Sequence, residues 1–541
     1  MIRPLLALSA LVITCQDGRS QQPVSSANRI AAEISSQTFT SHFRFLSDDL
    51  FEGRGPGTRG GRLAASYIAA QFKRIGLTPA GAESGWFQPF SLTARRTVRS
   101  ELAVGDDHFA PGTEQALTIL GSDTLREYQG QAVFVGYGIV APEYHWDDYK
   151  DVDVRGKLVI AIIGHPGQVD STIFTATGNY GTRTAKTLEA LRHGAVGALV
   201  IYRAQAGYPW GQAIRYWFQG TVFLTGADST PGTPAGISGW IRDTAAARLL
   251  RSAGLDLPTL IARSANRDFR PIPVALDLRA AAAMNGRSIQ GRNVMGLWPG
   301  HGDDADEVVI LGGHYDHLGI GASIDGDSIY NGAEDNANGI GGLLTIAEAY
   351  ARSGIVPHRS ILFIAFDAEE AGLLGSESYV RSPVVPLERT AAMLNLDGLN
   401  VYSRTSDTWA LGLEYSTLAS VYRNAAREEG LVVELGAHEK KFLEEQQFFT
   451  RSDHYNFARA GVPALFIWGG YTAVGKPAGW IQQKLEEYLS TRYHRPSDQM
   501  QDWYSYDGTV ADMRVLARTL YAVAMAPRFP TWSPDSPYQR R

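Results

Sequence analysis

The 541-residue sequence has little cysteine, little excess charge and no long apolar run, and each shortage excludes a class of protein. Its one cysteine, Cys15, leaves the chain without a partner for an internal disulfide. With 50 Lys and Arg against 56 Asp and Glu, the net charge of -6 excludes the basic surface that nucleic-acid binding requires. Hydrophobic residues at 44% and charged residues at 20% exclude a disordered chain and are typical of soluble globular proteins.

The apolar run at the N-terminus, residues 4–14, is far shorter than the ~20 residues that span a bilayer. Together with Arg3 it predicts a secretion signal over residues 1–15. Cys15 stands where the run ends, which resembles the lipobox of bacterial lipoproteins, although Thr14 replaces the usual Gly, Ala or Ser. We expect a periplasmic or extracellular protein, either an outer-membrane lipoprotein attached only through a lipid on Cys15 or a soluble one.

The length predicts more than one domain, because a domain has ~150 residues on average. Two styles of sequence alternate after the polar linker at residues 16–30, and they divide the chain as follows: first part of the main domain 31–120, an inserted small α/β domain 121–275, second part of the main domain 276–525, and a solvated tail 526–541.

The second part of the main domain alternates buried strands with helices. Strand-like runs include residues 307–316, 360–367 and 393–398, and a glycine-rich helical run covers residues 340–354. Such repeated βαβ units predict an α/β fold with a mostly parallel central sheet and helices on both faces.

Four of the polar clusters follow apolar strands of this predicted sheet, where open α/β sheets bind their ligands. They are His314-Tyr315-Asp316, Glu334-Asp335-Asn336, Glu369-Glu370 and Asp397, and a later segment adds Tyr493-His494. On an extended segment, residues two apart face the same way, so we expect Asp316 to orient His314 through its second ring nitrogen.

This set predicts a metal site, because carboxylates gathered at one edge repel each other unless cations lie between them. Nitrogen and oxygen ligands suit a catalytic zinc. Five ligands exceed the needs of one four-coordinate ion and suit two metals bridged by one carboxylate: His314, Asp335, Glu370, Asp397 and His494. Glu369, beside a ligand, is placed to take a proton from an activated water. Each cluster taken alone is more often a surface loop or a helix cap.

The motifs GGHYDHLG, GAEDNANG, FDAEEAGLLGS, NLDG and YHRPSD resemble the metal-site motifs of the co-catalytic zinc exopeptidases, which include bacterial leucyl aminopeptidases and glutamate carboxypeptidase. The resemblance runs from about residue 31 to residue 525. It includes EGRGPGTRGG (52–61), similar to part of the family's N-terminal segment, and GKLVIAIIG (156–164), similar to its protease-associated domain insert.

The resemblance implies two Zn²⁺ ions: one held by His314, Asp335 and Asp397, the other by Asp335, Glu370 and His494. It further implies Glu369 as general base, Asp316 as partner of His314 and Tyr493 as the group that polarises the scissile carbonyl. It gives His317 no metal. It also implies a cis peptide bond between Asp335 and Asn336.

We therefore predict an exported aminopeptidase that acts on peptides. Alternatives are a carboxypeptidase of the same family acting on acidic C-terminal residues, a glutaminyl cyclase, and a non-catalytic receptor-like binding module. Two further segments carry open readings. RSDHYNF (451–457) either lines the substrate pocket or caps a structural turn, and the aromatic segment 207–220 is either a lid or part of the inserted domain's core.

Overall fold

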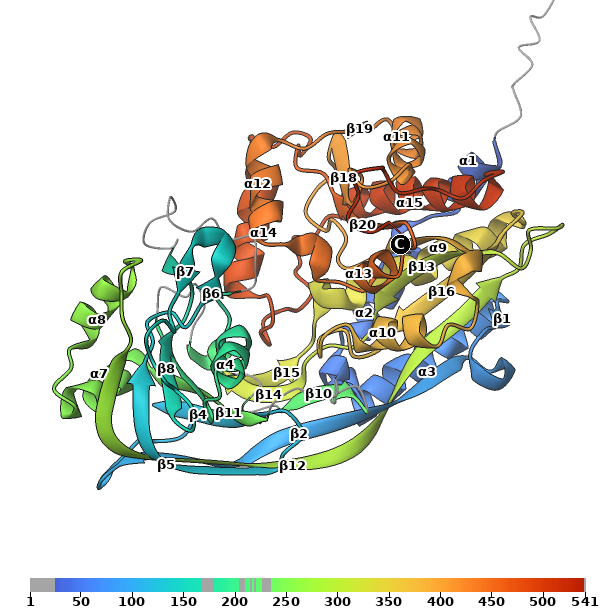
Figure 1. The fold of residues 1–541 in the computed structure, drawn as a ribbon. Helices are drawn as coiled ribbons and strands as arrows, with labels where there is room; N and C mark the ends of the chain where they lie inside the picture. The colour runs from blue at the N-terminus through green and yellow to red at the C-terminus, as the bar shows by residue number, and fades with distance from the viewer. Residues whose placement is uncertain are drawn as a thin grey trace, which may run out of the picture.

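The computed structural model describes residues 25–166, 180–203, 210–214, 217, 220–225 and 235–539. Figure 1 shows a larger body and a smaller body, joined by long strands that run along the base of both. The predicted signal peptide with Cys15 lies outside the described residues. Among the helices that are described, none has both the length and the apolar character needed to cross a bilayer.

The larger body is built on a sheet with the order β19-β18-β20-β17-β13-β16-β12. β13 pairs in parallel with β16 and β17, β17 with β20, and β18 with β19, whereas β12 is antiparallel to β16 and β18 is antiparallel to β20. The predicted α/β class is confirmed, with a parallel centre and antiparallel strands beside it. The strands are β12 (Ile272–Trp298), β13 (Val308–His314), β16 (Ser360–Phe366), β17 (Thr390–Asn395), β18 (Asp407–Leu411), β19 (Val432–Val433) and β20 (Ala464–Gly469).

Helices cover both faces of this sheet, because successive strand residues point to opposite sides. Val309 and Leu311 of β13 belong to one hydrophobic core and Ile310 to the other. The first core is closed by α1 (Ser26–Ala32), α2 (Ser36–Leu46), α3 (Arg59–Ile75), α9 (Asn338–Ser353), α11 (Leu418–Glu428) and α15 (Asp507–Met525). The second is closed by α10 (Leu374–Arg381), α12 (Ala437–Glu445) and α13 (His454–Arg459), and α14 (Trp480–Thr491) contributes to both.

The smaller body has its own sheet order, β5-β8-β9-β11-β4, in which all pairs are parallel except β11 with β4. Two separate hydrophobic cores lie on its two faces. The strands are β4 (Gln115–Leu120), β5 (Leu125–Phe134), β8 (Leu158–Ile162), β9 (Gly197–Tyr202) and β11 (Gly236–Arg242). The helices are α4 (Arg183–Arg192), α5 (Trp210–Ala213), α7 (Asp243–Ser252) and α8 (Leu257–Ser264).

β2 (Phe87–Val104) and β12 join the bodies into one continuous sheet. They pair antiparallel from Leu278 opposite Val104 to Val294 opposite Phe87. Figure 1 shows both strands running beneath the two bodies. Short elements complete the fold: β1 (Thr78–Pro79), β3 (Asp107–His108), β6 (Val140–Ala141), β7 (Trp146–Asp147), β10 (Thr221–Leu224), β14 (Gly319–Ile324), β15 (Asp327–Tyr330), and the turns η1 (Asp49–Arg54), η2 (Ala82–Ser84), η3 (Pro142–Tyr144), η6 (Ala333–Ala337), η7 (Leu387–Arg389) and η8 (Phe448–Thr450).

Three stretches differ from the sequence-based division. The predicted linker 16–30 already contains most of α1, whose first turn is capped by Ser25. The helix belongs to the folded body because Ile30 is fully buried in the first core. β4 falls within residues 31–120 yet pairs with β11 of the smaller body. The predicted solvated tail folds back on the larger body, where the Trp532 Nε1 donates to the carbonyl of Gly461 at 3.0 Å. The other domain limits remain predictions.

Candidate metal centre

The polar residues predicted from the strand ends meet at the carboxyl edge of the central sheet. His314 is the last residue of β13, Asp397 follows β17 by two residues, and Glu369 and Glu370 follow β16 by three and four. Parallel neighbours end at the same edge, so these side chains converge although up to 83 residues separate them in the chain.

One group of three side chains contains His314, Asp335 and Asp397. The Nε2 of His314 lies 3.1 Å from Asp397 Oδ1 and 3.3 Å from Asp335 Oδ1. One ligand atom of each residue lies within 4.8 Å of those of the other two. This is the first of the two ligand sets that the resemblance implies.

A second group shares Asp335 with the first. The Nε2 of His494 lies 3.1 Å from Asp335 Oδ2 and 3.1 Å from Glu370 Oε2. His317, to which the resemblance gives no metal, also belongs here, since its Nδ1 lies 2.6 Å from Glu370 Oε1 and 3.9 Å from Asp335 Oδ2. Asp335 thus turns one carboxylate oxygen toward each group.

The turn that presents Asp335 is held from several sides. The peptide bond between Asp335 and Asn336 is cis, as predicted. The Nδ2 of Asn336 donates to the carbonyls of His314 and Leu396, at 3.1 and 2.9 Å, and so ties the turn to two strand ends. The carboxylate of Asp498, in the predicted YHRPSD motif, accepts the backbone N–H of Asp335 at 3.2 Å.

Asp316 acts differently from the prediction. The Nδ1 of His314 lies 3.1 Å from the backbone carbonyl oxygen of Asp316 but 3.8 Å from its carboxylate. The carboxylate instead accepts the backbone N–H groups of Glu369 and Glu370, at 3.0 and 3.3 Å. Asp316 therefore contacts His314 through its backbone carbonyl and not, as predicted, through a hydrogen bond of its carboxylate, which the two backbone N–H groups occupy.

Glu369 and Tyr493 lie on the open side of the centre. The Oε2 of Glu369 is 3.9 Å from His314 Nε2, so the carboxylate adjoins the first group without belonging to it. The ring of Tyr493 stacks on that of His494 with centroids 3.7 Å apart. Its hydroxyl accepts a hydrogen bond from Arg451 Nη2 at 3.2 Å, which leaves the Tyr493 proton available to another acceptor.

Burial and charge set the protonation of the centre. Burial opposes ionisation of Asp335, but hydrogen bonds with His314 and His494 outweigh it and hold its pKa well below the usual range. Burial raises the pKa of Glu369 well above its ordinary value, with Asp397 acting in the same direction. The carboxylates thus depend on neighbouring positive charge to remain ionised.

The donors fit a pair of divalent cations. Imidazole nitrogens and carboxylate oxygens are the ligands that zinc takes in catalytic sites. His317 Nδ1 and Glu370 Oε1 are close but poorly aligned, so neither atom makes a hydrogen bond to the part of the chain that is described. Buried polar atoms left in this way require a partner, and a cation bound between such groups supplies one.

Arg54 is a buried residue of this region whose contacts the sequence did not predict. It is 1% exposed and comes from η1 of the predicted EGRGPGTRGG segment. Its guanidinium donates to four backbone carbonyls, those of Leu46, Tyr315, Asn331 and Gly332. The segment's glycines were the only sequence signal of an unusual backbone here.

Glu334 is the second such residue. Its carboxylate accepts hydrogen bonds from Tyr402 at 2.6 Å and Tyr504 at 2.7 Å, and Arg492 Nη1 lies 2.7 Å away. Arg492 stands two residues before His494, so this network fixes the later ligand segment to the turn that carries Asp335.

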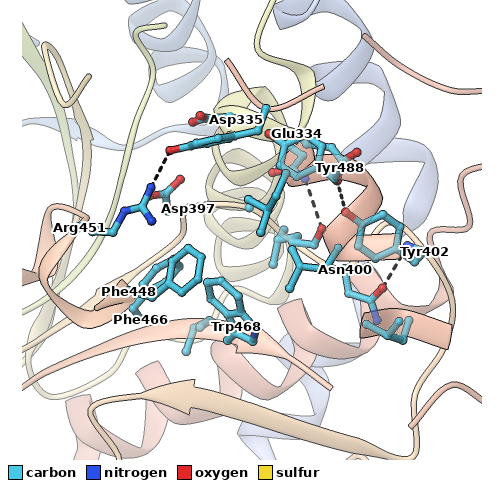
Figure 2. A pocket seen from close by; sticks show the side chains of 18 of the residues that line it. Glu334, Asp335, Asp397, Asn400, Tyr402, Phe448, Arg451, Phe466, Trp468 and Tyr488 are labelled. Carbon is cyan, nitrogen blue, oxygen red and sulfur yellow. Dashed lines mark hydrogen bonds between the residues drawn. The ribbon is translucent and has the colours of Figure 1, made fainter. Parts of the chain in front are cut away.

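A cavity of about 150 Å³ opens beside the centre (Figure 2). Glu369, Asp397 and Tyr493 lie on its wall next to the metal groups, and most of the remainder is apolar or aromatic. The apolar wall consists of Leu399, Phe448, Phe466, Ile467, Trp468, Ile481, Leu485 and Leu489. Among the described residues that line it, Arg451 is the one lysine or arginine.

The structure distinguishes between the two interpretations given for each of the segments 451–457 and 207–220. In RSDHYNF, Arg451 lines the cavity, whereas Asp453 and His454 are fully buried beneath it. In the aromatic segment 207–220, Trp210 and Trp217 donate their indole N–H groups to backbone carbonyls at 2.9 Å and pack on a core of the smaller body. The core reading is favoured for these two tryptophans.

Residues 293–518 match the family model of peptidase family M28. This part of the chain is therefore similar to peptidase family M28. The match covers all of the predicted metal ligands and the cavity wall.

Curated relatives are similar over part of their length. The leupeptin-inactivating enzyme 1 of Streptomyces exfoliatus is 28% identical over 213 residues, 39% of this chain and 43% of the relative. A probable glutamate carboxypeptidase of Arabidopsis thaliana is 29% identical over 299 residues, 50% of this chain and 38% of the relative. The chain spans about half the length of the first curated relatives that it matches.

Solved structures share the fold over nearly the whole chain. The aminopeptidase from Aneurinibacillus sp. strain AM-1 superposes with a TM-score of 0.57 at 18% identity, covering 95% of this chain and 100% of that one. A zinc aminopeptidase from Bacillus subtilis gives 0.52 at 17% identity, with 91% and 96% covered. At these identities the likeness establishes the mixed α/β fold.

Proposed function

We propose that this protein is a two-zinc aminopeptidase that removes N-terminal residues with apolar side chains from peptides. The observation that carries the proposal is the pair of ligand groups that share Asp335, beside an apolar cavity. The aminopeptidase names of relatives and of proteins with the same fold support it.

The residues that would hold the zinc ions follow from the two groups. His314, Asp335 and Asp397 would hold one ion, and Asp335, Glu370 and His494 the other. His317 is the rival for the second position, since it approaches Glu370 more closely than His494 does. When bound, zinc supplies an activated water and stabilises negative charge on a carbonyl oxygen.

The protein's own groups would move the protons. Glu369, raised in pKa by burial and adjacent to His314, would accept a proton from the attacking water and deliver it to the leaving amine. The Tyr493 hydroxyl, already accepting from Arg451, would donate to the scissile carbonyl oxygen. Asp316 would keep Glu369 and Glu370 in place through their backbone N–H groups.

The cavity separates the two exopeptidase readings. Its apolar wall suits an apolar side chain, and the carboxylates that line it beside the metal groups suit a positively charged α-amino group. An acidic C-terminal residue would meet Arg451 alone, whereas a pocket for two carboxylates needs more donors. The carboxypeptidase remains the second candidate because of the related glutamate carboxypeptidases.

We also propose that the protein acts outside the cytoplasm, with the signal-like residues 1–15 as the support. In this proposal the smaller body is the protease-associated domain implied by the resemblance. Cell fractionation with and without Cys15→Ser, combined with detection of a lipid on the mature N-terminus, tests the lipoprotein form against the soluble one.

The deciding experiment is metal analysis of the purified full chain together with peptide hydrolysis. Leu-, Phe- and Glu-initiated peptides are compared free and N-acetylated, beside a blocked peptide ending in glutamate. Two zinc ions per chain and cleavage of free Leu and Phe peptides alone are expected. Cleavage of the blocked peptide would move the assignment to the carboxypeptidase, and absence of any cleavage by zinc-loaded protein would favour the binding module.

A further inference from the structure

Arg54 occupies an unusual position for an arginine. It is 1% exposed, and its φ of 50° lies in the left-handed region, as do those of Glu52 and Gly53 before it. Non-glycine residues keep such conformations only where the surroundings enforce them. The Arg54 guanidinium makes four hydrogen bonds to backbone carbonyls from this position.

These hydrogen bonds link two loops that lie apart in the sequence, one that follows His314 and one that precedes Asp335. The Nε of Arg54 donates to the carbonyl of Tyr315, between His314 and Asp316, at 2.7 Å. The Nη1 and Nη2 donate to Asn331 and Gly332, which precede the turn of Asp335, at 2.5 and 2.8 Å. One planar group therefore sets the spacing between the His314 loop and the Asp335 loop.

A fourth hydrogen bond fixes the guanidinium to helix α2. Nη1 also donates to the carbonyl of Leu46 at 2.7 Å, at the end of α2. Since α2 packs against α9, the helix that follows Asp335, the anchor belongs to the same rigid core. Arg54 also adds the positive charge that acts on the buried carboxylates of Asp335, Asp316, Glu370 and Asp498.

We propose that Arg54 is a positioning residue for the metal centre, which sets the distance between the His314 and Asp335 loops and thereby the affinity for zinc. The inference rests on the proposed two-zinc function. It makes the EGRGPGTRGG segment, more than 250 residues before the ligands, a part of the centre.

The fork geometry, rather than the charge, carries this role. A guanidinium presents five N–H donors in one plane, and four carbonyls here use that arrangement. A lysine would keep the charge, but its three N–H donors sit on one atom and cannot reach the four carbonyls of Leu46, Tyr315, Asn331 and Gly332 together. Lysine should therefore fail to replace Arg54.

The test compares Arg54→Lys with a matched control, Arg359→Lys, in the full chain. Arg359 is 3% exposed and also donates to backbone carbonyls, those of Val523 and Ala526, but it precedes β16 at the opposite edge of the sheet. Zinc affinity is measured by calorimetry, and the ligand geometry by the visible absorption of the cobalt-substituted protein. Thermal unfolding of the metal-free proteins measures how much stability each variant loses, so that a change in zinc affinity can be compared at similar stability.

Arg54→Lys should lower zinc affinity by about 10–100-fold, with an altered cobalt spectrum and a reduced kcat. Arg359→Lys should keep wild-type zinc affinity and spectrum although it unfolds at a lower temperature. Equal zinc affinity and identical spectra in the two variants would overturn the proposal. If wild-type protein binds no zinc, the proposed function fails instead, so the two failures are distinguishable.

Should Arg54→Lys not fold, the wild-type protein decides by nuclear magnetic resonance with ¹⁵N-labelled arginine. The Nε–H groups of Arg54 and Arg359 are both buried and hydrogen-bonded, and loss of one resonance in Arg359→Lys tells them apart. Zinc binding should shift the Arg54 resonance and leave that of Arg359 in place. An unchanged Arg54 resonance on zinc saturation would overturn the proposal.

Discussion

The larger and the smaller body both bury ionisable groups beside a parallel sheet, but they satisfy them in different ways. In the smaller body, Lys186 is fully enclosed and donates to the carbonyls of Tyr137 and Gly164, at 2.5 and 2.8 Å. Burial lowers its pKa to about 7, while the buried carboxylate of Asp148 acts in the opposite direction. These groups find their partners within the same body.

In the larger body, the carboxylates of Asp335, Glu370 and Asp397 meet at one strand edge. Atoms such as Glu370 Oε1 and both ring nitrogens of His317 make no hydrogen bond to the described residues. A buried ionisable group therefore does not by itself indicate a functional site. What indicates one is a buried set whose partners the fold does not supply.

The largest effect is expected from removing the shared ligand. Asp335→Ala should lose both metals and all measurable activity, because each ligand group contains this carboxylate. Chelation of the wild-type protein should do the same reversibly. Elemental analysis and hydrolysis of a leucine peptide measure the result. Retention of one zinc by Asp335→Ala would show that the groups are independent, and Asp303→Ala on the surface is the control.

Glu369→Gln separates the proton acceptor from the ligands. It keeps the side-chain shape and leaves both ligand groups intact, so zinc content should stay at the wild-type value. Loss of a general base lowers kcat by ~10²-fold or more, as measured at saturating substrate. Near-normal turnover would move the role to another group.

Lys186→Met tests the smaller body. It leaves the buried carbonyls of Tyr137 and Gly164 without this donor, and a buried polar group left unpaired costs ~1–3 kcal/mol. The free energy of unfolding in urea should fall by that amount, whereas zinc content and kcat of the folded protein should not change. Arg192→Met, at a side chain 68% exposed, is the control. A fall in zinc content would show that the two bodies are coupled in function.

His454 tests a third arrangement, a buried histidine enclosed by aromatic rings. Phe449 and Phe466 lie with ring centroids 4.7 and 5.2 Å from it, and burial lowers its pKa to about 3. Below pH 6.5 the unfolded chain takes up a proton that the folded chain does not, so stability is full above pH 6.5 and falls toward pH 3.

At pH 5 the loss through His454 should be about 2 kcal/mol, at 1.36 kcal/mol per pH unit below 6.5. Urea unfolding at pH 7 and pH 5 measures it, and His454→Phe should show a smaller difference between the two values by this amount. An equal pH dependence in His454→Phe would show that His454 titrates normally.

Sequence alone determined the βαβ pattern and the positions of the candidate ligands. Apolar runs such as residues 360–367, alternating with helical runs, predict buried parallel strands, and the polar residues after them then fall at one edge. The sequence therefore predicted one set of five ligands: His314, Asp335, Glu370, Asp397 and His494. The cis peptide bond was predicted from the resemblance of the motifs to the zinc exopeptidases. These are consequences of local pattern and of the rule that parallel strands end at the same edge.

Tertiary structure decided the contacts made by backbone atoms and by distant segments. The Asp316 carboxylate accepts the backbone N–H groups of Glu369 and Glu370, more than 50 residues away in the chain, which no spacing rule encodes. Arg54 reaches the centre because α2 packs against α9 and its preceding turn, while η1 packs against α3, β14 and β15. The same holds for His317 and for the docked C-terminal segment. Sequence periodicity reports which residues are buried along one element, whereas the partner across the core depends on how whole elements pack.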